Sequence, residues 1–381
     1  MSANTMNVYL DNAATTAIDP KVLEVMIPLL RDEYGNPSSI HSFGRVSRSI
    51  IEKSRKNIAQ HLNCAPGELF FTSGGTEADN MAISSGMFDL GINHAITSNI
   101  EHHAVGHTLE NLAKKGLIHL SYVNLDNKGN VDLNHLDEML ASSPRSFVSL
   151  MHANNEIGNL LPIKEVGEMC KAHNAIFHSD TVQTMAHYAF DLQSIHVHFV
   201  TGAAHKFHGP KGIGFLYIND DITINPMIFG GGQERNMRAG TENIYAIAGM
   251  SKAMDIAYHS LSDHRKHIEG LKRRLIDGLT QSIAGVEFNG ESANMENSLY
   301  TVLNVLFPAT DIAEMLFYNL DILGVATSGG SACSSGSNIG SHVLNNIGVD
   351  MKRPSLRFSF SRFNTEEEID YTIHQLKSLF S

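Results

Sequence analysis

Short apolar runs alternate with longer amphipathic stretches through the first two thirds of the chain. The amphipathic stretches keep apolar residues at helical spacing, and the first of them begins at Asp19-Pro20, a typical helix cap followed by a first-turn proline. The runs that we expect to form strands are 69–72, 94–97, 118–123, 147–151, 175–178, 197–201 and 213–218. This rhythm predicts a mostly parallel sheet covered by helices.

The last third of the chain follows a different rhythm. A long helical region is expected from about 241 to 283. Strands near 300–305 and 356–360 and helices near 310–319 and 365–379 come after it. This order predicts a second, smaller α+β domain.

One lysine, Lys206, lies in the polar stretch 204–212 between the predicted strands 197–201 and 213–218. A strand-to-turn corner holds a side chain rigidly and leaves it open to a ligand, and a lysine amine held there can form a Schiff base with a carbonyl compound. Asp180 ends another predicted strand, and an aspartate near such a lysine is the partner that a protonated pyridine nitrogen requires. The pair indicates pyridoxal 5′-phosphate, although either residue alone is simply explained as a solvated turn lysine or a helix cap.

Polar clusters fall at the ends of several predicted strands. They lie at 101–103, at 152–158, at Asp180 with Gln183, and at His205 with Lys206. Because ligands collect at the carboxyl ends of parallel strands, we expect these clusters to build one site.

The strand at 69–72 runs into Ser73-Gly74-Gly75-Thr76, after which a helix begins. Bare N–H groups and the positive end of the helix dipole attract an anion at such a turn, and Thr76 adds a hydroxyl. The turn has neither the Gly-Lys-Ser/Thr of a Walker loop nor Gly-x-Gly-x-x-Gly, so a monophosphate fits it better than a nucleotide. The alternative is a capped helix without a ligand.

Three of the 21 histidines, His102, His103 and His107, are close together in the sequence. A metal site is one interpretation, but no carboxylate lies among them at ligand spacing on the same helical face. A single imidazole stacked over an aromatic cofactor ring explains one of these histidines equally well.

Composition narrows the class of protein. A hydrophobic fraction of 42% and a charged fraction of 18% over 381 residues are typical of a globular protein of two domains. A formal charge of -12 without clustered Lys and Arg argues against direct nucleic-acid binding. No apolar run reaches the length of a membrane span, and the N-terminus lacks a secretory signal, so the cytoplasm is the expected location.

The three cysteines, at positions 64, 170 and 333, are too far apart for a disulfide framework or a closed zinc site. Cys64 and Cys170 are expected to be buried as small apolar residues. Cys333 lies in a segment, 327–340, composed mostly of Gly, Ser, Thr and Asn, which predicts a mobile loop. A thiol on such a loop is best explained as a nucleophile or carrier.

Arg357 lies in the predicted strand Ser355-Leu356-Arg357-Phe358-Ser359-Phe360, whose large apolar residues share the opposite face. It is either merely exposed or it binds a substrate carboxylate through its planar guanidinium group.

Together these motifs resemble the cysteine desulfurases, pyridoxal-phosphate enzymes of the class V aminotransferase group. The resemblance is to the subclass with the longer cysteine loop, which serves nitrogen fixation and housekeeping iron-sulfur assembly. It extends over nearly the whole chain and rests on Leu10-Asp11-Asn12-Ala13-Ala14-Thr15-Thr16, Gly35-Asn36-Pro37-Ser38-Ser39, Thr72-Ser73-Gly74-Gly75-Thr76-Glu77, Glu101-His102, Asn154-Asn155-Glu156, Asp180 with Gln183, His205-Lys206, Arg238-Ala239-Gly240-Thr241, Gly330-Ser331-Ala332-Cys333 and Arg357. It implies an α/β protein of fold type I, with a mainly parallel sheet of the seven-stranded type and a smaller α+β domain.

The resemblance also implies residue roles. The implied catalytic residues are Cys333 as the nucleophile, Lys206 bound to the cofactor, and His102 stacked on the cofactor ring. The other implied contacts are Asp180 to the pyridine nitrogen, Gln183 and Asn155 to the ring oxygen, Arg357 with Asn155 to the substrate, and Gly75, Thr76, His205 and the partner subunit's Thr241 to the phosphate.

The implied reaction converts L-cysteine and an acceptor thiol into L-alanine and a persulfide. The sulfur would be carried on Cys333 to an iron-sulfur scaffold or another acceptor protein, and Cys333 would also be a candidate ligand of an iron-sulfur cluster shared with it. A homodimer is expected, with a large domain at 17–250 and a small domain at 1–16 plus 251–381. A selenocysteine lyase, a plain aminotransferase and a non-catalytic scaffold are the alternatives.

One position departs from the family pattern. Ala203 stands where the family usually has a serine that binds the phosphate. A hydrogen bond to a charged group contributes about 1.5 to 3 kcal/mol, so the cofactor affinity is expected to be roughly ten- to a hundredfold weaker, unless water or Thr201 substitutes.

Overall fold

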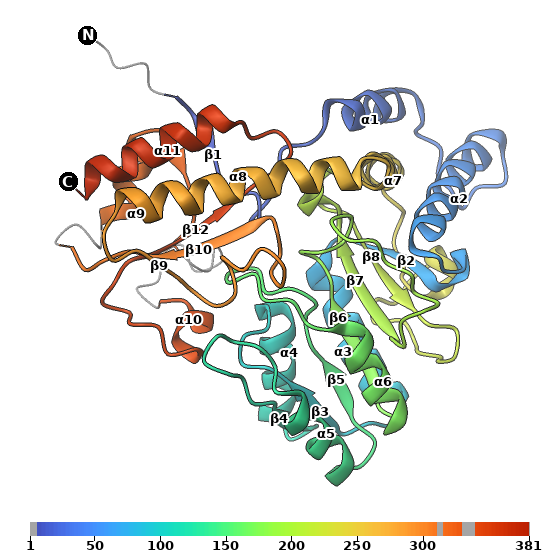
Figure 1. Ribbon diagram of the computed structural model, residues 1–381. Coiled ribbons are helices and arrows are strands. Elements are labelled where there is room, and N and C mark those ends of the chain that lie inside the picture. Colours follow the sequence, from blue (N-terminus) through green and yellow to red (C-terminus); the bar gives the residue numbers. More distant parts are fainter. Residues whose placement is uncertain (1–5, 311–314, 330–339, 381) are drawn as a thin grey trace.

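The computed structural model describes residues 6–310, 315–329 and 340–380. The chain forms a large part around a seven-stranded sheet and a smaller part that contains both the beginning and the end of the chain (Figure 1). Among the described residues, no helix has the length and apolar character needed to cross a membrane.

The central sheet confirms the predicted fold class. Its strands are β2 (Leu69–Thr72), β3 (His94–Thr97), β4 (His119–Tyr122), β5 (Phe147–Ser149), β6 (Ile176–Asp180), β7 (Phe199–Ala203) and β8 (Gly214–Ile218). They lie in the order β2-β8-β7-β6-β5-β3-β4. Strands β3 to β7 are parallel, and only β8 runs antiparallel to its neighbours β7 and β2. The sheet is therefore mainly parallel, as expected.

Helices cover both faces of this sheet. Successive side chains of a strand point to opposite faces, so the apolar strands make both faces apolar. In β6, Ile176 packs in one apolar cluster and Phe177 in the other; in β7, Phe199 and Val200 divide in the same way. The first face is covered by α3 (Gly75–Asp89) and α4 (His103–Lys114). The other is covered by α1 (Pro20–Asp32), α2 (Ser42–Leu62), α5 (Leu133–Ser142), α6 (Ile163–Ala172) and α7 (Ile244–His259).

The long helical region predicted at 241–283 is two helices, α7 and α8 (Leu261–Ser282). They are separated at Ser260, whose backbone leaves helical geometry (φ -118°, ψ 25°). Residues of α7 as far as Ala257 pack in the core of the large part, whereas α8 contributes to the core of the smaller part. The division expected between residues 250 and 251 stays a prediction, and α7 runs through that point.

The smaller part is built on two short sheets. Strand β1 (Val8–Tyr9) pairs in parallel with β11 (Val325–Ala326), and β12 (Ser355–Ser359), β10 (Val302–Leu306) and β9 (Glu287–Phe288) form an antiparallel sheet. Helices α8, α9 (Leu316–Ile322) and α11 (Glu366–Leu379) pack on them, and α10 (His342–Asn346) packs instead against Ile100 and Ile157 of the large part. Three single 3₁₀ turns complete the described elements: η1 (Pro66–Glu68), η2 (Ala204–Lys206) and η3 (Gln233–Asn236).

Candidate active site

Lys206 ends the 3₁₀ turn η2, which follows β7 without a gap. Its Nζ donates hydrogen bonds to the backbone carbonyls of Ala13 and Ala14, the latter at 3.0 Å. The N-terminal segment therefore crosses over the end of the sheet, where Thr16 N also binds His205 O at 2.9 Å. The amine is held at the carboxyl edge of the parallel strands, where ligands bind in sheets of this kind.

A cavity of about 290 Å³ lies beside Lys206. It is lined by Ala13, Ala14, His102, His103, Asn155, Glu156, Gln183, Lys206, His342 and Arg357. Five residues proposed from the sequence thus share one cavity, although they come from five separate parts of the chain: His102, Asn155, Gln183, Lys206 and Arg357. A larger cavity of about 470 Å³ elsewhere, beside Glu101, is lined by no lysine, arginine or histidine.

Asp180 is the last residue of β6 and is buried. Its Oδ1 accepts a hydrogen bond from Val182 N at 2.8 Å. Burial, together with the nearby Asp79 carboxyl, raises the pKa of Asp180 above its usual range. A buried carboxyl of this kind ionises readily when a cation is placed against it.

His102 is the residue at which α4 is capped, and its Nδ1 accepts a hydrogen bond from Ala104 N at 3.2 Å. Burial lowers the pKa of His102, so its imidazole is neutral near pH 7. His103 and His107 stack on each other with their ring centroids 4.5 Å apart, and His103 also lies 4.6 Å from His342.

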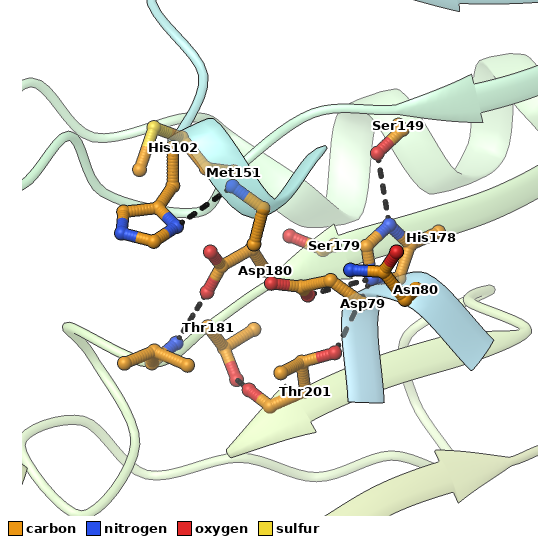
Figure 2. Close-up of polar contacts among 12 residues, drawn as sticks. Asp79, Asn80, His102, Ser149, Met151, His178, Ser179, Asp180, Thr181 and Thr201 are labelled. Atoms are coloured by element: carbon orange, nitrogen blue, oxygen red, sulfur yellow. Dashed lines mark hydrogen bonds and ion pairs between the residues drawn. The ribbon is translucent and has the colours of Figure 1, made fainter. Parts of the chain in front are cut away.

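Sequence analysis missed two members of the site, Asp79 in α3 and His178 in β6. Single ligand atoms of Asp79, His102 and Asp180 all lie within 4.8 Å of one another, so two carboxyl groups from distant parts of the chain lie near His102. Figure 2 shows these groups beside His178, whose Nε2 lies 3.4 Å from Asp79 Oδ1. The available signal was the strand period of two, which puts His178 and Asp180 on the face that α3 covers.

The first turn of α3 has no side-chain cap among the described residues. A Cβ at Gly75 would lie 2.8 Å from Val182 Cγ2, so glycine permits the close packing of this turn on the segment after Asp180. His205, beside Lys206, has its pKa lowered to about 4 by burial and by the Lys206 charge. Thr76 is exposed at the same helix end, which leaves N–H groups of the first turn open to an anion.

Thr201, the residue that could substitute for the serine that Ala203 replaces, is engaged elsewhere. Its Oγ1 lies 3.3 Å from His178 Nε2, within the buried polar group behind the sheet end. Ala203 is itself buried beside Gly75. A phosphate contact from Thr201 stays a prediction, and this engagement of its hydroxyl disfavours it.

Arg357 is 1% exposed, so the interpretation of it as a merely exposed residue is wrong. Its guanidinium group donates to Asp11 Oδ1 at 2.8 Å and to Asn155 O at 2.9 Å. Its Nε has no hydrogen-bond partner among the described residues. The Arg357 side chain lines the cavity, and a guanidinium group in this position is the kind of group that binds a carboxylate.

Cys333 lies outside the described residues, but both flanks of its segment are anchored at the cavity. On one side Ser328 exchanges backbone hydrogen bonds with Arg357, at 2.7 and 3.2 Å. On the other, Ser341 Oγ donates to Glu156, and His342 Nε2 lies 3.0 Å from Glu101 O.

The other two cysteines and Thr241 lie away from this cavity. Cys170 is buried and Cys64 half-buried, and burial raises the pKa of each thiol to about 12. Neither is a nucleophile near neutral pH. Thr241 is exposed, on the loop that precedes α7.

The described residues fit pyridoxal 5′-phosphate. The cofactor has an aldehyde, a pyridine nitrogen and a phosphate. The chain offers the Lys206 amine, the buried Asp180 carboxyl and the uncapped start of α3 as counterparts in one region. The unpartnered Arg357 Nε further indicates that a ligand completes the cavity.

Comparison with known proteins gives consistent matches. The family model of class-V aminotransferases matches residues 8–372. Cysteine desulfurase IscS of Clostridium botulinum (strain Hall) is 40% identical over 376 residues, covering 98% of this chain and 94% of that protein. A solved structure of a NifS-like protein aligns with a TM-score of 0.89 at 37% identity, covering 98% of this chain and 99% of that one. A structure of SspA in complex with cysteine gives 0.82 at 30% identity, covering 94% and 100%.

Proposed function

This chain belongs to the aminotransferase class-V family, within it to the pyridoxal-phosphate-dependent cysteine desulfurases, and we propose that the cavity beside Lys206 is its active site. There L-cysteine is converted into L-alanine, and its sulfur is left as a persulfide on Cys333. One observation carries this proposal: a single cavity joins Lys206, Arg357 and both flanks of the Cys333 segment.

Residues at the sheet edge would hold the cofactor. Lys206 would bind its aldehyde carbon, Asp180 its pyridine nitrogen, and Gly75, Thr76 and His205 its phosphate, while Gln183 and Asn155 would contact the ring oxygen. The neutral imidazole of His102 would stack on the ring. When bound, pyridoxal phosphate supplies an electron sink that stabilises negative charge on the substrate's Cα.

Arg357 orients the substrate. Its side chain lines the cavity together with Asn155 and Lys206, and its buried Nε has no hydrogen-bond partner among the described residues. A substrate carboxylate bound there is held by a charge-assisted hydrogen bond, while Asp11 fixes the far side of the guanidinium group. This places the Cα proton of the substrate toward Lys206 Nζ, which accepts it as the general base.

Cys333 takes the sulfur. Its thiolate attacks the sulfur of the substrate; an S–S bond forms, and the Cβ–S bond breaks with its electron pair left on carbon, which is protonated to give alanine. Cys333 is five positions from Ser328, and a chain of that length spans at most about 17 Å. A nucleophile tethered to the Arg357 strand is therefore within reach of the cavity.

The persulfide is passed to an acceptor protein, which we propose to be an iron-sulfur scaffold or another sulfur carrier. A cluster ligated jointly by Cys333 and the acceptor remains part of this proposal. We place the reaction in the cytoplasm, because a thiol carrier and the free thiols of Cys64 and Cys170 suit a reducing compartment.

The enzyme is proposed to act as a homodimer. Large apolar side chains are exposed over residues 27–46 and at position 229: Ile27, Leu30, Tyr34, Ile40 (91%), Phe43 and Phe229 (82%). Such a concentration of exposed apolar surface is typical of a protein interface. The partner copy would contribute Thr241 to the phosphate site, which light scattering combined with the cofactor affinity of Thr241→Ala would test.

A direct assay tests the function. Purified protein incubated with L-cysteine and a thiol acceptor is expected to release alanine, and mass spectrometry is expected to find one added sulfur on the Cys333 peptide. Release of a keto acid in place of alanine would contradict the proposal, as would added sulfur on Cys64 or Cys170.

A further inference from the structure

Asp79 is a buried carboxyl group that is only partly satisfied: the Thr201 hydroxyl donates to it, which favours its charged form. It is 1% exposed, and its Oδ1 has no hydrogen-bond partner in the described part of the chain. The nearest basic atom is His178 Nε2, 3.4 Å away. An ionised carboxylate left in this state would be strongly destabilising.

The surroundings of Asp79 favour a state in which the two carboxyl groups of Asp79 and Asp180 together hold one proton. One oxygen of Asp79 and one of Asp180 lie within 4.8 Å of each other, and two buried carboxylates that close do not both ionise readily. His178 cannot supply the balancing charge, because burial lowers its pKa to about 4. Burial likewise raises the pKa of Asp79 to about 7.

We propose that Asp79 is a positioning residue of this enzyme: its carboxyl shares one proton with Asp180 and, with His178 behind it, sets the charge that Asp180 presents to the cofactor's pyridine nitrogen. This inference rests on the proposed role of Asp180. Asp79 is not itself expected to touch the cofactor.

A hydrogen-bonded chain supports this assignment. His178 Nδ1 lies 2.8 Å from Ser149 Oγ, and Thr201 Oγ1 lies 3.3 Å from His178 Nε2 (Figure 2). An imidazole that donates its Nδ1–H to Ser149 presents the Nε2 lone pair to Asp79. Asp79 Oδ1 lies 3.4 Å from this lone pair, so the shared proton is favoured on Asp79 and the negative charge on Asp180 when the ring nitrogen is bound.

The other ionisable groups around Asp79 and Asp180 do not change the number of protons that this pair holds. Among the described residues they are His178 from β6, His102 and Glu101 from the turn before α4, and Lys206 from η2, which acts on His102. Burial raises the pKa of Glu101 to about 8, so this group is largely neutral at pH 7. The neighbouring Thr201 and Ser149 are uncharged.

The test is the pH dependence of cofactor binding to the apoprotein. Asp180 must be ionised to bind a protonated pyridine ring, so affinity falls as the pH drops through the pKa of Asp180. Asp79→Asn removes the carboxyl that competes with Asp180 for the proton, while burial remains. Molecules in which Asp79 carries the charge and Asp180 the proton are then lost, and a like charge at this range shifts a pKa by about one unit or more. We expect the acid-side midpoint of the pyridoxal 5′-phosphate dissociation constant to move down by about one pH unit.

Controls separate this effect from loss of structure. Ile83→Val removes a core methylene from α3 without touching the polar group, and its midpoint should equal that of the unmutated protein. The cofactor phosphate titrates in all these proteins, so its contribution cancels. An unchanged midpoint in Asp79→Asn, or an equal shift in Ile83→Val, would overturn the inference.

Two further measurements complete the test. If Asp180→Asn keeps the normal pH profile, the proposed role of Asp180 fails; if Asp180→Asn loses the acid-side fall and Asp79→Asn retains it unshifted, only this inference fails. Carbon-13 NMR of the unmutated apoprotein, labelled at aspartate carboxyl carbons, needs no variant. We expect one aspartate to stay protonated to about pH 6 or above, and titration of every aspartate below about pH 5 would contradict the proposal.

Discussion

Two groups of buried charged side chains differ in how completely they are satisfied. Arg55 and Glu234 pair through two hydrogen bonds of 2.8 Å; Arg55 Nη1 also donates to Leu69 O, and Glu234 Oε2 also accepts from Phe71 N. Arg55 also lies 4.5 Å above the Phe71 ring. In this group the positive charge of Arg55 balances the negative charge of Glu234, and both side chains also form hydrogen bonds with the backbone.

The group at the sheet end is the opposite case. Asp79 and Asp180 are two carboxyls close together, His178 is neutral, and one oxygen of Asp79 is without a partner. The Arg55–Glu234 pair is satisfied and connects the edge strand β2 to η3, so it stabilises the fold. The Asp79–Asp180 group has an unbalanced charge, which favours the binding of a charged ligand. The comparison indicates that changes in the first group alter stability and changes around the second alter chemistry.

The largest effect is expected from Lys206→Ala, which should abolish covalent attachment of the cofactor and lower alanine formation by about a thousandfold or more. The melting temperature of the apoprotein should be almost unchanged, since the Lys206 side chain is half-buried and its Nζ binds backbone carbonyls of the N-terminal segment. Lys211→Ala is the matched control, because Lys211 is exposed. Borohydride reduction followed by peptide mapping decides the assignment, and a label on Lys211 would refute it.

Cys333→Ser should be nearly as severe for turnover, but it acts after the cofactor is bound. The variant is expected to keep the yellow colour and the first spectral change on adding cysteine, since Lys206, Asp180 and Arg357 are intact. Alanine formation should collapse, because a serine hydroxyl is barely ionised near neutral pH. Alanine release at the original rate would contradict the proposed nucleophile.

Arg55→Met tests the other group. It leaves Glu234 buried without its cation, which is expected to lower the free energy of unfolding by about 3 to 5 kcal/mol. Urea unfolding of the apoprotein measures this, and the turnover of folded protein at low temperature should change little. If Arg55→Met kept its stability but lost turnover, the conclusion that the Arg55–Glu234 pair serves stability and not chemistry would be wrong.

The smallest effect is expected from Ala203→Ser, which restores a donor beside Gly75 at the start of α3. Since Thr201 is engaged with His178, the new hydroxyl should tighten cofactor binding roughly ten- to a hundredfold without changing the substrate. Equilibrium titration of the apoprotein measures it. An unchanged dissociation constant would mean that water or another group already supplies the contact.

Local patterns in the sequence predicted most of the large part correctly. Strands β2 and β3 have the predicted bounds, and α1 begins after Asp19, whose side chain accepts from Lys21 N at 2.7 Å. These features depend on neighbours within a few residues, namely strand alternation and the free N–H groups of a first helical turn. For the same reason the positions of Asp180 and Lys206 at strand ends could be read directly.

What only the tertiary structure decided depends on residues far apart in the chain. Arg357 is buried because Asp11 and Asn155 bind it, and no local pattern in its strand reveals those partners. The break at Ser260 separates two helices that pack in different cores. Asp79 meets Asp180 because α3 lies against β6 and β7, a contact that joins positions about a hundred residues apart. Whether a charged side chain is buried or paired depends on how distant parts of the chain pack. For this reason only the tertiary structure revealed the unbalanced group of Asp79, Asp180 and His178 at the sheet end.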